Sequence, residues 1–195
     1  PGSADICSKG ADLFAFLVPQ LGTALAGGNS TIGEAGSLGG VGHFSAAVRA
    51  TAVSGVLPSK GIPLTLQGSA ATGSDFGAAR TVVPMATADL ALGLFKGLPL
   101  GLTNVGGVDL LLSGTMIPAV DKGTISLRPQ GSAFALGYGV RVGALQESAL
   151  VPGLSASFLR RKVPTLDADY VSGNDSLRVR TMTMTANSLR LVVSK

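Results

Sequence analysis

Apolar and polar residues alternate with a period of two along most of the chain after residue 42, a pattern typical of β-strands. The most regular stretch places on one face Phe134, Leu136, Tyr138, Val140 and Val142. Similar alternation covers residues 43–52, 86–94, 108–115, 151–161 and 181–195. The pattern predicts about six long antiparallel strands, and glycines and a proline at residues 97–107 predict a hairpin between two of them.

The connections between these stretches alternate in length. Residues 54–81, 118–132 and 164–176 are long and rich in Pro, Gly and Ser, whereas residues 97–107 and 146–149 are short. Outer-membrane barrels have short turns on one side and longer loops on the other. We therefore interpret the three long segments as loops at one end of a sheet.

The N-terminal part of the chain has a different pattern. Residues 12–25 carry apolar side chains broadly on one helical face, and glycine-rich sequence follows to residue 40. We predict a short helix and a glycine-rich loop over residues 1–40, as a plug or periplasmic segment, and strands over residues 41–195. Pro19, Gln20 and Gly22 interrupt the apolar stretch, which is shorter than the roughly 20 residues of a membrane-spanning helix. We expect the helix to pack inside or under a barrel, with the membrane interface as the alternative.

The second face of the strands carries small residues and isolated charges. A soluble β-sandwich usually has many Lys, Glu and Thr residues on its solvent face, whereas this face is rich in Gly, Ala, Ser and Thr. Strands of ten or more residues also match the length of tilted membrane-spanning strands. The sequence thus predicts an all-β fold, an antiparallel up-and-down transmembrane β-barrel or part of one. Its candidate lumen-lining residues are Arg49, Asp89, Asp109, Arg141 and Arg190.

Composition narrows the classes of protein that fit. Charged residues make up 13% and the mean hydropathy is +0.45, which argues against intrinsic disorder. The net charge of +4 is too small and dispersed to indicate nucleic-acid binding. One cysteine, Cys7, and one histidine, His43, argue against a disulfide framework or a zinc site, and we expect no metal and no cofactor. Aromatic residues, at 5% and without Trp, are sparser than the girdles of most membrane barrels.

Three groups of residues are candidates for a chemical site. His43 and Ser45 share a strand face, but no carboxylate or amide lies nearby in sequence to activate them, so we expect no catalytic centre. Four residues in one segment carry side-chain oxygens that calcium could bind: Asp167, Asp169, Asn174 and Asp175. Their spacing fits no calcium loop, so we interpret them as a solvated loop. The basic residues 160–162 end a strand, where they either meet anionic lipid headgroups or face solvent.

Three segments carry a family resemblance: LVPQLGTALAGGN at 17–29, GGVGHF at 39–44 and VPGLSASFLRR at 151–161. With them the chain resembles bacterial outer-membrane β-barrel proteins that are broadly similar to transporters of fatty acids and other hydrophobic compounds. The Asn-Pro-Ala segment of those transporters is absent. The resemblance implies a signal peptide, a barrel in the bacterial outer membrane and a longer full-length protein.

These observations predict an outer-membrane β-barrel that acts as a passive channel or a hydrophobic-solute transporter and not as an enzyme. Its expected partners are outer-membrane lipid and small hydrophobic or ionic solutes, with selectivity set by the lumen charges. Six strands are too few for a barrel of at least eight, so we expect the missing strands either beyond Lys195 or within the segments interpreted as loops. A secreted or surface structural β-protein is the alternative, and solubility without detergent distinguishes the two. An outer-membrane hydrolase ranks third.

Overall fold

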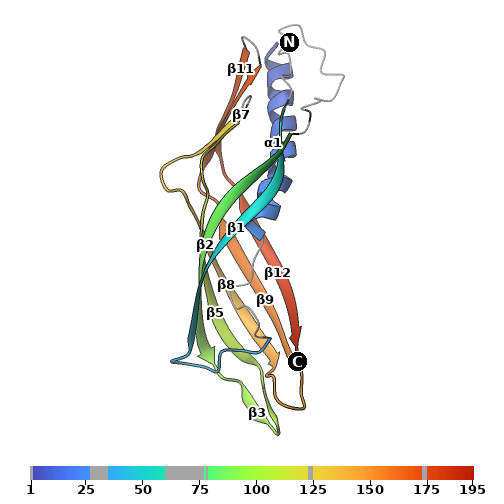
Figure 1. Ribbon diagram of the computed structural model, residues 1–195, viewed down its shortest axis with the longest axis vertical. Helices are drawn as coiled ribbons and strands as arrows, with labels where there is room; N and C mark the ends of the chain where they lie inside the picture. The colour runs from blue at the N-terminus through green and yellow to red at the C-terminus, as the bar shows by residue number, and fades with distance from the viewer. Residues whose placement is uncertain (1, 27–34, 60–76, 78, 123–124, 173–174) are drawn as a thin grey trace.

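The protein consists of one N-terminal helix followed by antiparallel β-structure (Figure 1). The computed structural model describes residues 2–26, 35–59, 77, 79–122, 125–172 and 175–195. Their elements are α1 (Gly2–Ala26), β1 (Phe44–Leu57), β2 (Ala79–Phe95), β3 (Leu98–Leu100), β4 (Thr103–Val105), β5 (Gly107–Met116), β6 (Val120–Lys122), β7 (Ile125–Pro129), β8 (Phe134–Leu145), β9 (Gly153–Lys162), β10 (Leu166–Ser172), β11 (Asp175–Met182) and β12 (Thr185–Ser194).

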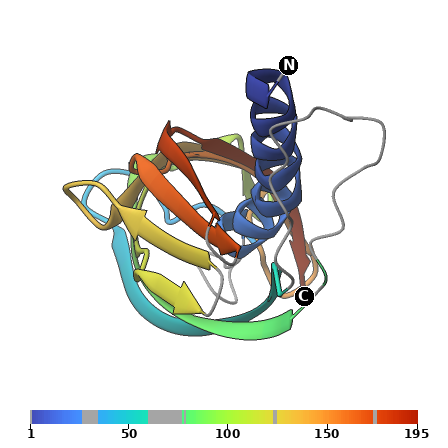
Figure 2. The same cartoon turned by 90° about the horizontal axis from the view of Figure 1, so that it is seen from above.

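Six long strands form one antiparallel sheet in the order β1-β2-β5-β8-β9-β12. This sheet curls into a half-barrel, which is clearest from above (Figure 2). The prediction of six long strands is confirmed, and so is the predicted hairpin between the second and third, where β3 pairs with β4. We call the end of the sheet that carries this hairpin the lower end, and the opposite end the upper end (Figure 1).

A second sheet of four short strands continues the upper end in the order β11-β10-β7-β6. The interpretation of residues 118–132 and 164–176 as loops is therefore wrong, because they contain most of this sheet. The hairpin β6–β7 lies between β5 and β8 in the chain, and the hairpin β10–β11 lies between β9 and β12. Pairing of β7 with β10 joins the two hairpins.

Helix α1 begins well before the predicted residue 12. It contacts β1, β11 and β12, and so lies between the two edge strands of the six-stranded sheet (Figure 2). Leu13 and Leu17 are buried, and the side-chain carbonyl of Gln20 accepts a hydrogen bond from the Val56 N–H at 3.0 Å. In the part of the chain that is described, no helix has the length and apolarity needed to cross a membrane.

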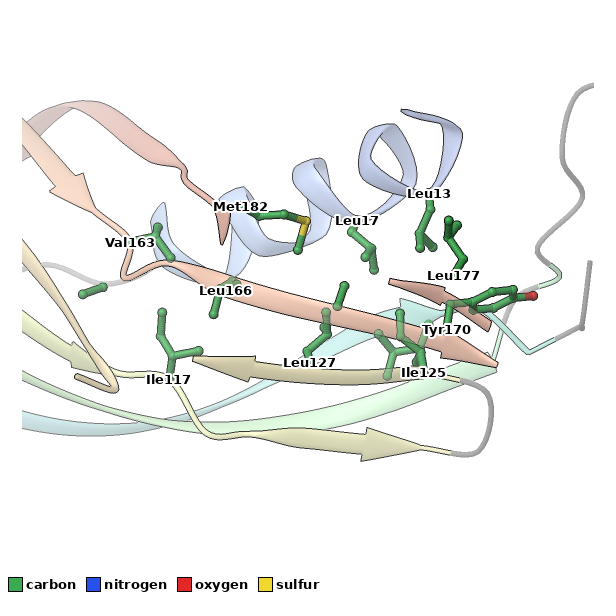
Figure 3. Close-up of a cluster of buried hydrophobic side chains, with 13 residues drawn as sticks. Leu13, Leu17, Ile117, Ile125, Leu127, Val163, Leu166, Tyr170, Leu177 and Met182 are labelled. Atoms are coloured by element: carbon green, nitrogen blue, oxygen red, sulfur yellow. The ribbon is translucent and has the colours of Figure 1, made fainter. Parts of the chain in front are cut away.

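The main hydrophobic core lies in the upper half, between α1 and the two sheets (Figure 3). Leu13 and Leu17 of α1 pack there with Ile125, Leu166 and Tyr170 of the short strands. A smaller cluster, Ala91, Leu111 and Leu159, lies on the concave face of the six-stranded sheet. The upper half is therefore packed like an ordinary globular domain, whereas the lower half is not.

Candidate functional site: the concave face of the half-barrel

All five predicted lumen residues lie on the concave face of the half-barrel. Residues directly opposite each other in neighbouring antiparallel strands share a face. One such row crosses five strands through Gly93, Asp109, Arg141, Ser157 and Arg190. A second row contains Asp89, and Arg49 lies on the same face of β1 one row further up. The alternation therefore assigned their face correctly, while their role in a lumen stays a prediction.

Asp109 and Arg141 form a buried ion pair. Arg141 Nε donates to Asp109 Oδ2 at 2.8 Å. The side chain of Arg141 is 3% exposed and that of Asp109 is 0% exposed. The same carboxylate accepts the Leu38 backbone N–H, at 3.1 Å to Oδ1 and 3.2 Å to Oδ2. Charge-assisted bonds of this kind compensate for the desolvation of a buried carboxylate. Asp109 therefore links β5, β8 and the segment that precedes β1.

Asp89 and Arg49 form a second ion pair on this face. Arg49 Nε donates to Asp89 Oδ2 at 3.0 Å, and its terminal nitrogen contacts the same oxygen. Asp89 is buried, and its Oδ1 has no hydrogen-bond partner among the described residues. One carboxylate oxygen of this pair is therefore buried without a hydrogen bond from the described residues.

Sequence reasoning missed Arg161, a second arginine that is buried on the concave face. The sequence analysis treats residues 160–162 as one basic strand end. In the structure Arg160 and Lys162 point outward, whereas Arg161 points inward and is 2% exposed. Its side chain lies over Gly137, and its Nε donates to Ser113 Oγ at 3.4 Å. Strict alternation along β9 would have placed Arg161 on the face of the inward residues Ser155 and Ser157.

Residues 35–42, which we call the inner segment, lie against the lower part of the concave face. The Ser37 N–H donates to Gln146 Oε1 at 3.0 Å, and Leu38 packs on the small apolar cluster. Glycines leave the necessary space: a Cβ on Gly143 would lie 2.8 Å from Ser37 N, and one on Gly93 would collide with the Gly40 carbonyl. The lower concave face is therefore filled by side chains and by the inner segment.

The convex face of the half-barrel is apolar and exposed. One register row crosses all six strands through Phe44, Leu92, Leu110, Val140, Phe158 and Leu189. Five of the nine aromatic residues point outward here: Phe44, Phe95, Phe134, Tyr138 and Phe158. A soluble protein rarely exposes such a continuous apolar surface, which marks a contact with lipid or with another protein.

The polarity of the sheets reverses in the upper half. In the four-stranded sheet the inward residues are apolar, as with Ile125 opposite Tyr170, and the outward residues are charged, as with Asp167 opposite Arg128. Below it the inward residues include the buried ion pairs and the outward ones are mostly apolar, with Arg160 and Asn187 as exposed exceptions close to the change. The change occurs near the row of Leu136, Lys162 and Thr185. The molecule therefore has a charged outer surface above this row and a mostly apolar outer surface below it.

An apolar cavity of about 70 Å³ lies where α1, the long strands and the short strands meet. Its lining is almost entirely aliphatic and includes Leu17, Leu57, Val83, Met85 and Leu127. Gln20 and Thr81 are its polar members, and the Gln20 carbonyl is already bonded to Val56. The cavity therefore suits an apolar group and offers little to an ion.

The other candidate residues are not brought together as a site. His43 is exposed, and its Nδ1 lies 3.3 Å from the Gly40 carbonyl oxygen. Asp167 and Asp169 belong to β10 and not to a loop, and both form ion pairs with Arg180. Asn174 lies outside the described residues, and among those described no three His, Cys, Asp or Glu side chains gather as metal ligands.

Comparison with known proteins adds no further identification. No family model, curated protein or solved structure matches this chain.

Proposed function

We propose that the six-stranded half-barrel is part of the wall of a β-barrel in the bacterial outer membrane, and that the protein carries hydrophobic solutes across that membrane. The reversal of polarity between the two halves of the molecule carries the proposal. An apolar outer face over a charged inner face is the arrangement of membrane barrels, whose outer surface meets lipid and whose interior is polar.

The dimensions of the sheet fit this placement. Strands β5, β9 and β12 have ten residues each. At about 3.4 Å per residue and a tilt near 45°, ten residues span about 24 Å, close to the apolar band of known barrels. Phe95 near the lower end and Phe134 near the upper end are placed like a sparse aromatic girdle.

Transport of hydrophobic solutes is favoured over passive conduction of ions. Side chains and the inner segment fill the lower part of the described concave face, so they leave no continuous polar path through it. The apolar cavity beside α1, in contrast, is lined by groups that stabilise hydrocarbon.

Both strands at the edges of the half-barrel, β1 and β12, pair on one side among the described residues. In the proposed membrane state their other edges pair with further strands, because lipid satisfies no backbone hydrogen bonds.

Two valine substitutions test membrane placement. Val140 points outward in the apolar row, and Val171 points outward from the upper sheet. Val140→Lys is expected to lower the free energy of unfolding of the vesicle-folded protein by about 2–4 kcal/mol, because a charge at the level of the acyl chains is costly. Val171→Lys, the matched control, is expected to have little effect because it meets water. Urea titration of the vesicle-folded protein measures both.

Equal behaviour of the two variants would contradict membrane placement. A wild-type protein that folds and stays monodisperse without detergent or lipid would favour the alternative, a secreted or surface structural β-protein. For such a protein Val140→Lys would improve solubility, because it replaces an exposed apolar group by a charge.

A further inference from the structure

The concave face has more positive than negative charge. Within the described residues it carries Arg49, Arg141, Arg161 and Arg190 against Asp89 and Asp109. Arg49 pairs with Asp89, and Arg141 pairs with Asp109. The remaining two cations, Arg161 and Arg190, have no carboxylate at ion-pair distance in the described part of the chain.

Arg161 is buried despite this lack of a counterion. It is 2% exposed, and its recorded hydrogen bond goes to the neutral hydroxyl of Ser113. Asp89 interacts with it favourably, but Arg49 and Arg190 both repel it. Burial of an unpaired charge is costly, and a guanidinium group that points into a polar interior is usually compensated.

We propose that the concave face binds an oxyanion at Arg161, with Arg190 as the second cation of the site. A guanidinium group presents parallel N–H donors whose geometry matches a carboxylate or a phosphate group. Ser113 supplies a hydroxyl beside Arg161. The Asp89 carboxylate nearby attracts Arg161 but forms its ion pair with Arg49, so Arg161 keeps its N–H donors for another acceptor.

The anion comes from a dissolved solute and not from a lipid headgroup. Arg161 and Arg190 lie on the face opposite the apolar convex surface. Arg160 and Lys162, which point outward, are the residues that lipid phosphates would reach. The proposal rests on the burial and the missing counterion of Arg161, and it holds whether or not the protein transports hydrophobic solutes.

Binding of inorganic phosphate to the full chain, folded in an uncharged detergent, tests the site. The line width of the phosphate ³¹P signal and the shift of the unfolding temperature with phosphate, at constant ionic strength, are the two measurements. Arg161→Gln and Arg190→Gln are each expected to weaken binding about tenfold or more, because a charge-assisted hydrogen bond is lost. Arg160→Gln, the outward neighbour, is the matched control and should bind like the wild type. Acetate in place of phosphate shows which oxyanion is preferred.

If Arg161→Gln folds poorly, the unfolding temperature of Arg190→Gln, measured first without and then with phosphate, still tests the proposal. Arg190→Gln should then unfold at a higher temperature than the wild type, because it removes the repulsion of Arg161, and phosphate should stabilise it less than it stabilises the wild type. The proposal is overturned if phosphate does not bind the wild type, or if Arg160→Gln weakens binding as much as Arg161→Gln does. Equal stabilisation by vesicles of an anionic phospholipid in wild type and Arg161→Gln would assign lipid binding to Arg160 and Lys162 alone.

Discussion

The side chain of Asp109 joins two distant parts of the chain to β5. It accepts from Arg141 and from the Leu38 N–H, and it is fully buried. A buried pair of this kind stabilises little over an apolar replacement of both partners, but loss of one partner leaves an uncompensated charge. The residue therefore matters most when it is removed alone.

Asp109→Ala is expected to lower the free energy of unfolding by about 3–5 kcal/mol, because Arg141 then stays buried without its counterion. Urea unfolding of the detergent-folded protein measures the loss. Asp121→Ala breaks an exposed pair with Arg128 and serves as the control, with an expected effect of at most about 1 kcal/mol. A loss as small for Asp109→Ala as for Asp121→Ala would show that the concave face is hydrated and not dry.

At the same scale, alternation predicted which face each lumen residue occupies but not which residues are buried. Arg49, Asp89 and Asp109 could be placed on one face from period two alone. Burial of Arg161 depends on Gly137, which leaves room for its side chain, and on the register that brings the two residues opposite each other. Alternation within each strand does not specify how β8 and β9 align with each other. The contact between Arg161 and Gly137 therefore could not be predicted from the sequence.

Among the elements, the β10–β11 hairpin depends on one carboxylate. Asp167 accepts from Gln130 Nε2 at 2.7 and 2.8 Å, from Arg180 at 2.9 Å and from the Thr181 N–H at 3.0 Å. Thr181 has φ of 55°, a left-handed conformation that is uncommon for a residue with a side chain. Asp167 therefore holds the irregular end of β11 against β10 and β7.

These hydrogen bonds, first that of Gln130 and then those of Thr181 and Arg180, hold the pKa of Asp167 below its ordinary value of 3.8. A depressed folded-state pKa contributes stability that is present above the unfolded value and is lost as the pH falls through the folded value. We expect the difference in unfolding temperature between wild type and Asp167→Asn to shrink as the pH falls from 6 to below about 3. A difference that stays constant over this range would contradict the ionised role of Asp167.

Elements that depend on distant partners were not predictable from local pattern. The long strands repeat the alternation often enough to be found, but β6 has three residues and β7 five. Their identity as strands comes from pairing with each other and with β10, some forty residues later in the chain. Proline and glycine at both ends of these segments resemble loop sequence, and the pairing outweighs that local signal.

At the scale of the whole molecule, the apolar cavity exists because three units meet without filling the space between them. Helix α1, the upper ends of β1 and β2, and the short strands each contribute part of its lining. The cavity lies near the level where the outer surface changes from apolar to charged. In the proposed membrane state, a hydrophobic solute leaving the acyl-chain region would meet the cavity before it met water.

Neighbouring valines on β2 test this role. Val83 lines the cavity, whereas Val82 points outward and is exposed. Val83→Phe is expected to weaken binding of the uncharged apolar fluorophore N-phenyl-1-naphthylamine about tenfold, because the ring displaces roughly two methylene groups of ligand contact. Val82→Phe adds the same ring elsewhere and should bind the dye like the wild type, as fluorescence titration would show. Equal loss in the two variants, or none in either, would remove the cavity from the transport route.

The two hairpins that join at β7 and β10 have a consequence for the order of folding. Strands β9 and β12 are neighbours in the sheet but are separated in the chain by residues 163–184. Closing a loop of that length costs conformational entropy before any contact forms between its ends. Early pairing of β10 with β11 would shorten the effective loop and bring β12 back beside β9. The upper sheet would then form first and align β12 with β9 in the correct register. The last strand of the half-barrel would therefore be added late.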